Sequence, residues 1–253
     1  MKHSAWLLMF LTITTVCMAE TLEFVFSDFP PFECIENGFP AGINKEIIEE
    51  ACRRLDITPV FRQLPWKRAL LYAKEGKADA VFSLFINDER IRYYSFPEEN
   101  INTVRMVLIT DRESTIEINK LEDLKGKKTG VYLGSSYGDK FDRADWIIKE
   151  PAHTNDSLLR KQDAGRTDVA VIDERVAEYW CRKIGMEDRF RILRFIVTEN
   201  PTYVAFSKAK GEKNGKNLAD RFSVVFKEMK NEHFIEKINK KYMFGKSRKF
   251  GKE

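Results

Sequence analysis

Several side chains in this sequence could hold a charged small molecule, and Arg90 is the first of them. It follows a short apolar segment, residues 79–84, and ends the acidic run Asp88-Glu89-Arg90. A guanidinium group binds a carboxylate through two parallel hydrogen bonds, so Arg90 is a candidate for an anion site. On the local sequence alone, an exposed ion pair with its acidic neighbours is the simpler interpretation.

Asp173 is the second charged candidate. It follows the buried segment 168–172 and precedes a helix that we expect to begin at Glu174. Its carboxylate could bind a cation, or it could cap that helix by accepting backbone N–H groups. The sequence leaves both alternatives open.

Ser135 and Ser136 are the polar, uncharged candidates. They follow Gly134 at the expected start of a helix over about 137–148. Backbone N–H groups and hydroxyls at a helix N-terminus form a natural carboxylate site, and they are equally suited to capping the helix.

Other kinds of chemistry find little support. The chain has three histidines, and none lies in a nucleophile–His–acid arrangement. It has no Cys-x-x-Cys pair and no His-rich segment, so we expect neither a metal site nor a cofactor.

Composition sets the class of protein. Of the 253 residues, 43% are hydrophobic and 32% are charged, with 43 Lys and Arg against 39 Asp and Glu. A mean hydropathy of −0.41 excludes a polytopic membrane protein. The charges are mixed along the chain, which argues against a nucleic-acid partner.

The first nineteen residues have the layout of a secretory signal peptide. Lys2 and His3 precede an apolar run over 5–16, and Cys17-Met18-Ala19 supplies small residues for cleavage. We expect cleavage after Ala19 and a mature periplasmic chain beginning at Glu20. A buried N-terminal helix and a lipoprotein anchor at Cys17 are the less favoured alternatives.

The mature chain then contains three cysteines. Cys34 and Cys52 are close in sequence, and an oxidising compartment favours pairing, so a Cys34–Cys52 disulfide is a hypothesis. Cys181 would be left as a buried apolar residue.

The apolar pattern predicts strands and helices in alternation, in two rounds. The first round comprises strands over 22–27, 57–63 and 79–84 and helices over about 43–55 and 65–75. The second comprises a strand from Val104, strands over 128–133 and 168–172, and helices over about 137–148 and from Asn155 or Asp156 to Gly165. Two amphipathic helices, 217–230 and about 232–242, precede a basic tail over 246–252, which we expect to be frayed. Strand–helix–strand order implies parallel pairing with helices covering the sheet.

One short device occurs in both rounds. The segments 75–81 and 164–170 each contain a helix end, a glycine, a basic residue and an aspartate that enters a buried strand. This match argues for two similar lobes.

An ordered set of motifs resembles the family 3 extracellular solute-binding proteins, the polar-amino-acid receptors of ABC importers. The resemblance covers nearly all of the mature chain. The motifs are Pro30-Pro31-Phe32-Glu33, Gly42-Ile43-Asn44-Lys45-Glu46, Leu64-Pro65-Trp66-Lys67-Arg68, Glu75-Gly76-Lys77-Ala78-Asp79, Asn87-Asp88-Glu89-Arg90, Ser95-Phe96, Leu124-Lys125-Gly126-Lys127-Lys128, Gly134-Ser135-Ser136, and Gly165-Arg166-Thr167-Asp168 leading to Asp173.

The resemblance implies a two-lobe α/β fold of the Venus-flytrap type, in which two chain crossings act as a hinge. We expect the crossings near Asn102–Thr103 and Pro201–Thr202. Lobe one then comprises 20–103 and 203–253, and lobe two comprises 104–202. Each lobe is expected to be a mostly parallel sheet flanked by helices.

The resemblance also implies roles for the candidate residues in the cleft between the lobes. Arg90 would grip the carboxylate of an α-amino acid, and Asp173 would receive its ammonium group. Ser135 and Ser136 would support the carboxylate. The aromatic candidates for the cleft wall are Phe29, Trp66, Phe85, Tyr132 and Tyr137, of which Trp66 could instead be a core residue.

Two positions depart from the family pattern. Phe85 stands where the family usually has Ser or Thr, and Tyr132 stands where some members have a polar or basic side chain. Both changes make the cleft more aromatic, so the identity of the ligand is open.

The expected function is capture of a small zwitterion, an amino acid or a derivative, by a monomeric, non-enzymatic periplasmic receptor that delivers it to an ABC permease. An enzyme on the same scaffold, similar to the cyclohexadienyl dehydratases, is one alternative; only Asp28, Glu33, Asp173 and Glu174 are plausible acids or bases for it. A sensor or chemotaxis component that docks on a membrane receptor is the other.

Overall fold

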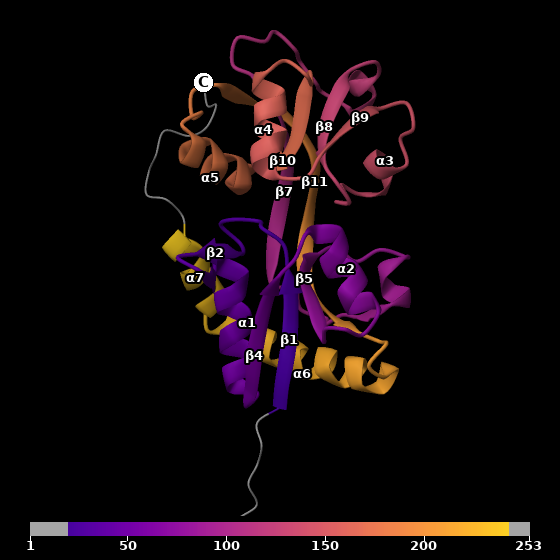
Figure 1. Cartoon of the computed structure of the whole chain (residues 1–253), viewed down its shortest axis with the longest axis vertical. Coiled ribbons are helices and arrows are strands. Elements are labelled where there is room, and N and C mark those ends of the chain that lie inside the picture. Colours follow the sequence, from indigo (N-terminus) through magenta and orange to yellow (C-terminus); the bar gives the residue numbers. More distant parts are fainter. Residues whose placement is uncertain (1–19, 243–253) are drawn as a thin grey trace, which may run out of the picture.

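The computed structural model describes residues 20–242, so the expected signal segment and the basic tail lie outside the described residues. Two α/β halves are stacked along the long axis of the molecule (Figure 1). The main sheet has the strand order β4 (Ile57–Gln63), β1 (Glu20–Phe26), β5 (Ala80–Leu84), β11 (Phe190–Ser207), β7 (Asn102–Asp111), β10 (Val169–Asp173), β8 (Lys128–Tyr132) and β9 (Ile148–Ala152). Strand β6 (Tyr94–Ser95) also pairs with β11. This is the α/β architecture with flanking helices that the sequence predicts.

In the first half, parallel strands are covered by helices, as the alternating pattern predicts. The elements are β1 (Glu20–Phe26), β4 (Ile57–Gln63), β5 (Ala80–Leu84), α1 (Ile43–Arg54), α2 (Trp66–Lys74), α6 (Glu212–Asn231) and α7 (Phe234–Tyr242). Strand β1 pairs in parallel with both β4 and β5. Apolar residues at helical spacing on α1, including Ile43, Ile47 and Ala51, are fully buried against this sheet.

The second half repeats this arrangement. Its elements are β8 (Lys128–Tyr132), β9 (Ile148–Ala152), β10 (Val169–Asp173), α3 (Asp139–Asp142), α4 (Asn155–Asp163) and α5 (Glu174–Ile184). Strand β8 pairs in parallel with β9 and β10.

The repeated device has the same structural role in both halves. Gly76 and Gly165 have φ of +72° and +64°, values that glycine adopts without strain. The following aspartates each accept a backbone N–H from a neighbouring strand: Asp79 from Glu23 at 2.8 Å and Asp168 from Lys128 at 2.7 Å. The short sequence match therefore corresponds to the same local structure in both halves: a glycine with positive φ followed by an aspartate that accepts a backbone N–H from a neighbouring strand.

Two long antiparallel strands connect the halves. They are β7 (Asn102–Asp111) and β11 (Phe190–Ser207), and both run from one half into the other (Figure 1). Thr103 pairs with Pro201 and Asn102 pairs with Thr202, so the residues expected at the two crossings are neighbours in the sheet. The lobe limits inferred from the sequence stay a prediction.

Several predicted elements differ from the structure. The helix expected over 137–148 is wrong: α3 covers only Asp139–Asp142, and β9 begins at Ile148. Helix α4 is capped by Thr154, whose side chain accepts the N–H of Ser157, rather than by Asn155 or Asp156. The sequence analysis also missed a hairpin formed by β2 (Cys34–Glu36) and β3 (Phe39–Ala41).

The predicted disulfide is wrong as well. Cys34, Cys52 and Cys181 are all free and buried in the described part of the chain. Cys52 packs in the core on the inner face of α1, whereas Cys34 begins the hairpin with its sulfur 3.7 Å from Glu36 Oε1. Sequence proximity therefore does not place the two sulfurs in contact.

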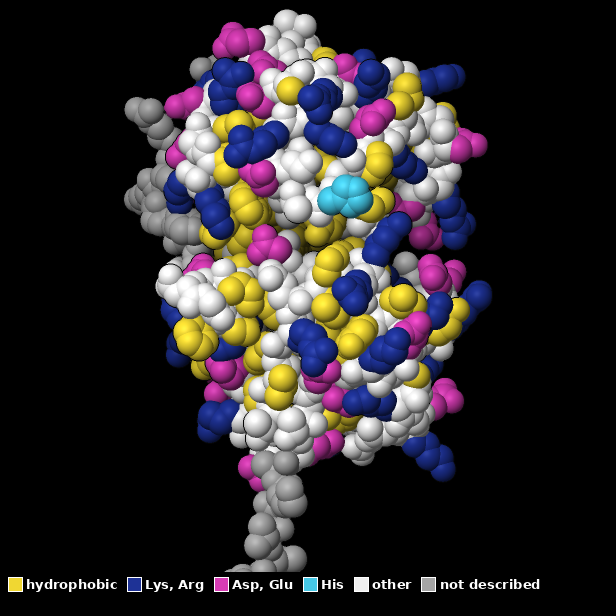
Figure 2. All heavy atoms as spheres, in the orientation of Figure 1, with side chains coloured by type: hydrophobic (Ala, Val, Ile, Leu, Met, Phe, Trp, Pro, Cys, Tyr) yellow, Lys and Arg dark blue, Asp and Glu magenta, His cyan; other side chains and the backbone are white. Residues whose placement is uncertain are grey.

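The surface carries both signs of charge over both halves, with hydrophobic side chains along the waist between them (Figure 2). Between Glu20 and Tyr242, the chain contains no helix with the length and apolarity needed to cross a bilayer.

Candidate functional site

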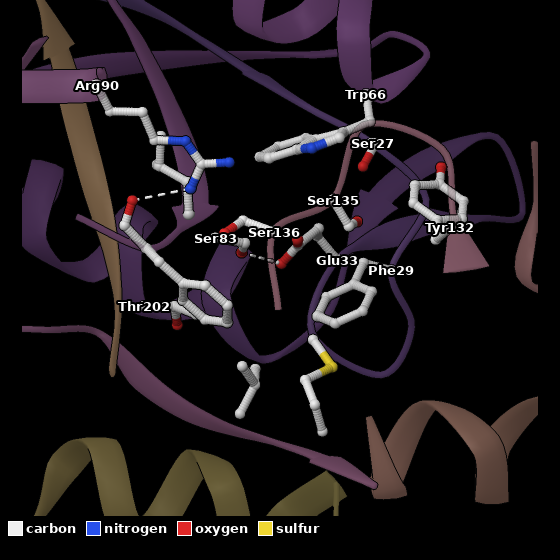
Figure 3. A pocket seen from close by; sticks show the side chains of 14 residues that line it. Ser27, Phe29, Glu33, Trp66, Ser83, Arg90, Tyr132, Ser135, Ser136 and Thr202 are labelled. Atoms are coloured by element: carbon white, nitrogen blue, oxygen red, sulfur yellow. Dashed lines mark hydrogen bonds between the residues drawn. The ribbon is translucent and has the colours of Figure 1, made fainter. Parts of the chain in front are cut away.

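A pocket lies where the two halves meet, and residues from both halves line it (Figure 3). It contains about 480 Å³ of space, open solvent included. The lining residues are Ser27, Phe29, Glu33, Trp66, Ser83, Leu84, Phe85, Arg90, Val104, Met106, Tyr132, Ser135, Ser136 and Thr202.

Arg90 supplies the positive charge of this pocket. It begins the short 3₁₀ helix Arg90–Arg92, its backbone N–H donates to Asn87 Oδ1 at 2.9 Å, and its Nη1 donates to the carbonyl oxygen of Phe85 at 2.8 Å. Only 8% of the residue is exposed, and burial lowers the pKa of the guanidinium from its ordinary value. No carboxylate within residues 20–242 forms an ion pair with it, and in Figure 3 the group points toward Trp66 and the pocket.

Glu33 supplies a buried carboxyl group to the same pocket. It is 1% exposed, and its Oε2 accepts hydrogen bonds from Ser83 Oγ at 2.8 Å and from Asn44 Nδ2 at 3.1 Å. Its Oε1 makes no hydrogen bond with the described residues. Burial raises the pKa of Glu33 to about 8, although the hydrogen bonds from Ser83 and Asn44 act to lower it.

From the sequence, Glu33 stands out only as part of a motif and as a possible acid. Glu33 follows the apolar segment Pro30-Pro31-Phe32, whereas Asn44 stands beside Lys45 and Glu46 and gives no such signal. Nothing in the sequence alone places Asn44 on the inner face of α1 beside that carboxyl.

A chain of hydrogen bonds connects Glu33 with the second half. Asn44 Oδ1 accepts from Asn102 Nδ2 at 3.3 Å, and Asn102 Oδ1 accepts from Arg175 Nη2 at 3.4 Å. Arg175 lies on α5 and also stacks over the ring of Phe32, 4.1 Å from its centroid. The guanidinium of Arg175 can only donate hydrogen bonds, so Asn102 must accept through its oxygen and donate through its nitrogen. The same then holds for Asn44, which fixes the direction of each hydrogen bond from Arg175 to Glu33.

Trp66 both lines the pocket and joins the halves. Its indole Nε1 donates to the carbonyl oxygen of Gly134 at 3.1 Å, and its ring packs with buried residues of β5 and α2. Trp66 is therefore both part of the pocket wall and part of the buried core.

The other aromatic candidates divide into two groups. Phe29, Phe85 and Tyr132 line the pocket, with Phe29 stacked on Phe32 at 5.0 Å between ring centroids. Tyr137 does not line it: its buried hydroxyl accepts the backbone N–H of Tyr132 at 2.7 Å and so fixes the end of β8.

Ser135 and Ser136 line the pocket from the second half, but they do not begin a helix. Helix α3 starts only at Asp139, and the Ser136 hydroxyl donates to Asp142 Oδ2. The expected helix N-terminus at these serines is therefore wrong, and any contact with a ligand would come from the loop itself.

Asp173 does not lie in the pocket. It is 1% exposed, and its carboxylate accepts the backbone N–H groups of Arg175 at 2.9 Å, Val176 at 3.2 Å and Arg105 at 2.9 Å. These bonds cap α5 and attach it to β7, which is the structural alternative that the sequence left open. The geometry gives no support to Asp173 as the acceptor of a ligand ammonium group.

A wider cleft continues from the pocket past Arg90. It contains about 1230 Å³ of space, open solvent included, and shares Arg90, Tyr132, Ser135 and Ser136 with the pocket. Lys74 and Lys149 lie on its walls with Glu89 and Asp142, so a ligand that extends beyond the pocket would meet both signs of charge.

The described residues contain no group of three or more His, Cys, Asp or Glu side chains that could hold a metal ion. From the described part of the chain, the pocket offers the guanidinium of Arg90 without an ion-pair partner, the buried carboxyl of Glu33 and several aromatic rings.

Comparison with known proteins gives a consistent result. The model of the bacterial extracellular solute-binding proteins, family 3, matches residues 24–246. The arginine-binding extracellular protein ArtP of Bacillus subtilis is 25% identical over 223 residues, which are 87% of this chain and 84% of that protein. The histidine-binding periplasmic protein of Escherichia coli is 24% identical over 220 residues, 85% of this chain and 84% of that protein.

Solved structures share the fold. A histidine kinase sensor domain with similarity to periplasmic binding proteins superimposes with a TM-score of 0.78 at 23% identity, covering 89% of this chain and 97% of that one.

Proposed function

This chain belongs to the bacterial extracellular solute-binding proteins of family 3, and we propose that it captures a small amino-acid-like zwitterion in the pocket between its halves. In this proposal the protein is not an enzyme. It acts as a periplasmic monomer, matured by cleavage after Ala19, and passes its ligand to an ABC permease.

One observation carries the proposal: the buried guanidinium of Arg90 faces the pocket without a carboxylate partner among residues 20–242. A buried charge without a counterion is costly, so a ligand carboxylate would relieve that cost when it binds. Each charged hydrogen bond contributes about 1.5–3 kcal/mol, and micromolar affinity requires about 8 kcal/mol. Two such bonds supply about 3–6 kcal/mol, and the aromatic contacts would supply the remainder.

Contacts between the halves support capture by closure. Trp66 on α2 bonds to Gly134 after β8, and Arg175 on α5 reaches Asn102 and Phe32. A ligand that contacts both sides of the pocket would stabilise this closed arrangement, because its affinity for the closed form would exceed that for an open one.

A thermal-shift screen of the chain beginning at Glu20 tests the proposal. The common L-amino acids serve as probes, each paired with its decarboxylated amine as a control. We expect at least one amino acid to raise Tm and its amine to have no effect. At one hundred times Kd a ligand adds about 2.7 kcal/mol, or about 5–10 °C for a chain of this size. A flat response to every amino acid would overturn the proposal.

A second candidate, an enzyme on the same scaffold, gains one argument from Glu33. A carboxyl with a pKa of about 8 is protonated at neutral pH and could act as a general acid. Incubation with prephenate and arogenate, followed by product analysis, separates the two candidates, and we expect no turnover.

A further inference from the structure

We propose that Glu33 receives the ammonium group of the ligand, and that ligand binding expels a proton from Glu33 to the solvent. This inference rests on the proposed function and defines the ligand class more closely: a compound with a carboxylate for Arg90 and a protonated amine for Glu33.

Glu33 and Arg90 both line the pocket, and they do not form an ion pair with each other. Each therefore retains binding capacity that the protein itself does not use. A zwitterion carries a partner for each group: a carboxylate for Arg90 and an ammonium for Glu33.

The carboxyl group of Glu33 accepts hydrogen bonds from the protein. Both protein donors, Ser83 Oγ and Asn44 Nδ2, reach the same oxygen, Oε2. The amide of Asn44 cannot be reversed, because its own oxygen accepts from Asn102, whose oxygen in turn accepts from Arg175. Asn44 Nδ2 also donates to Ser83 Oγ at 2.8 Å, which favours the Ser83 hydroxyl as a donor to Oε2. This leaves Oε1, which has no hydrogen-bond partner among the described residues, for the proton and for an arriving ammonium group.

The groups packed around Glu33 are neutral or acidic. Asn44 from α1 and Ser83 from β5 are neutral, the thiol of adjacent Cys34 is un-ionised, and Asp28 is acidic. Tyr132 and Arg90 face it only across the pocket.

These surroundings keep Glu33 protonated in the free protein. Burial is the main cause of its raised pKa, about 8, and the negative charge of Asp28 adds to it. No cation within the described residues offsets this effect. At neutral pH the free protein therefore holds the proton on Glu33.

The sign of the pH dependence follows. Binding converts a neutral carboxylic acid and an ammonium ion into a carboxylate–ammonium pair, and one proton leaves for the solvent. Affinity should therefore fall about tenfold per pH unit below pH 7. It should be greatest between about pH 8 and the pKa of the ligand's own ammonium group, above which the ligand loses the charge that Glu33 binds. Simple charge attraction at Arg90 predicts no such change, because arginine stays charged throughout this range.

The ligand-free protein gives the first test. Glutamate carboxyls are labelled with ¹³C, and the Glu33 resonance is assigned by its loss in Glu33→Gln. We expect a titration midpoint near pH 8 in the wild-type protein. A midpoint below pH 5 would overturn the inference without any ligand being known.

Calorimetry with an amino acid that binds gives the second test. The titration is run from pH 6 to 9 in two buffers of different ionisation enthalpy. We expect release of close to one proton at pH 7. In Glu33→Gln, a near-isosteric change, the release and the pH dependence should disappear, with affinity at pH 9 reduced about ten- to hundredfold.

Glu36→Gln is the matched control, since it removes an exposed carboxylate three residues away and should leave both properties unchanged. The outcomes separate the two proposals. If no amino acid binds the wild-type protein at any pH, the proposed function fails and the inference falls with it. If an amino acid binds with an affinity that neither pH nor Glu33→Gln alters, the inference fails and the proposed function stands.

Discussion

The indole Nε1 of Trp66 donates a hydrogen bond to the carbonyl oxygen of Gly134 over 3.1 Å, and this bond joins α2 of the first half to the loop after β8 in the second. The side chain of Lys67, next to Trp66, lies against the same glycine. Contacts between the halves therefore form this edge of the pocket. Substitutions of Trp66 or Gly134 should change closure and ligand binding together.

Trp66→Phe should weaken ligand binding about two- to tenfold. The variant keeps an aromatic wall but loses a neutral hydrogen bond worth about 0.5–1.5 kcal/mol in the closed form. Calorimetric Kd values for the amino acid found in the screen measure the effect. Trp180→Phe is the control, since Trp180 lies on α5 outside the pocket and should leave Kd unchanged. Equal Kd values for all three proteins would contradict a role for this bond.

Gly134→Ala should lower both stability and ligand affinity. Gly134 has φ +84°, and an added Cβ would lie 2.8 Å from Cγ of Lys67, so both backbone strain and the contact between the halves are affected. Gly165→Ala separates these effects, because Gly165 has φ +64° with no atom within 4 Å. Each variant should lose about 1–2 kcal/mol of stability from strain, but only Gly134→Ala should bind ligand more weakly. Identical ligand affinities would show that the loop is not involved in closure.

Arg90→Ala should reduce ligand affinity at least tenfold and remove most of the thermal shift. Among residues 20–242, Arg90 is the one arginine that lines the pocket, and the change removes with it at least one charged hydrogen bond of about 1.5–3 kcal/mol. Arg90→Lys keeps the charge but not the two-pronged geometry, so it should be intermediate. Arg92→Ala, an exposed residue of the same short helix, is the control. Wild-type affinity in Arg90→Ala would remove the basis of the proposed function.

Asp173→Ala should destabilise the protein without a matching loss of ligand affinity. It removes the cap of α5, which costs about 1 kcal/mol and corresponds to about 2–4 °C in Tm for a chain of this size. Because Asp173 lies outside the pocket, Kd should change less than threefold. A loss of affinity as large as that of Glu33→Gln would instead restore the ammonium-binding role that the family resemblance implies.

Thiol counting should find no reactive cysteine in the native chain beginning at Glu20 and three in the unfolded chain. Burial raises the pKa of Cys34, Cys52 and Cys181 to about 12 each, so neither access nor ionisation favours reaction. Reductant should leave Tm unchanged. A single thiol in the unfolded, unreduced protein would reveal a disulfide.

The sequence predicted the helices and strands with strong periodicity. The inner face of α1 and the limits of β4 follow directly from the pattern of apolar residues. Two elements were not predictable in this way. Helix α3 begins only after Gly138, whose φ is +94°, and spans four residues, and β11 alternates too weakly along its crossing segment.

The candidate site was predicted in part. Arg90, Trp66 and Phe85 lie in the pocket, as the resemblance implies. Asp173 does not, because a carboxylate before a helix is equally suited to capping it, and a one-dimensional pattern cannot distinguish these roles. The role of Glu33 was not predictable from the sequence either. Its hydrogen-bond partners Asn44 and Ser83 are distant from it in sequence and adjacent only in the fold.

The side-by-side course of β7 and β11 limits how the two halves can move. Thr103 and Pro201 face each other in a ladder that continues from Asn102 into the second half. Two separate tethers would allow the halves to twist and slide independently, whereas a paired ribbon resists shear and yields mainly by flexing across its width. We therefore expect the halves to move mainly in one direction of bending, so that each opening returns the same two pocket walls to the same register.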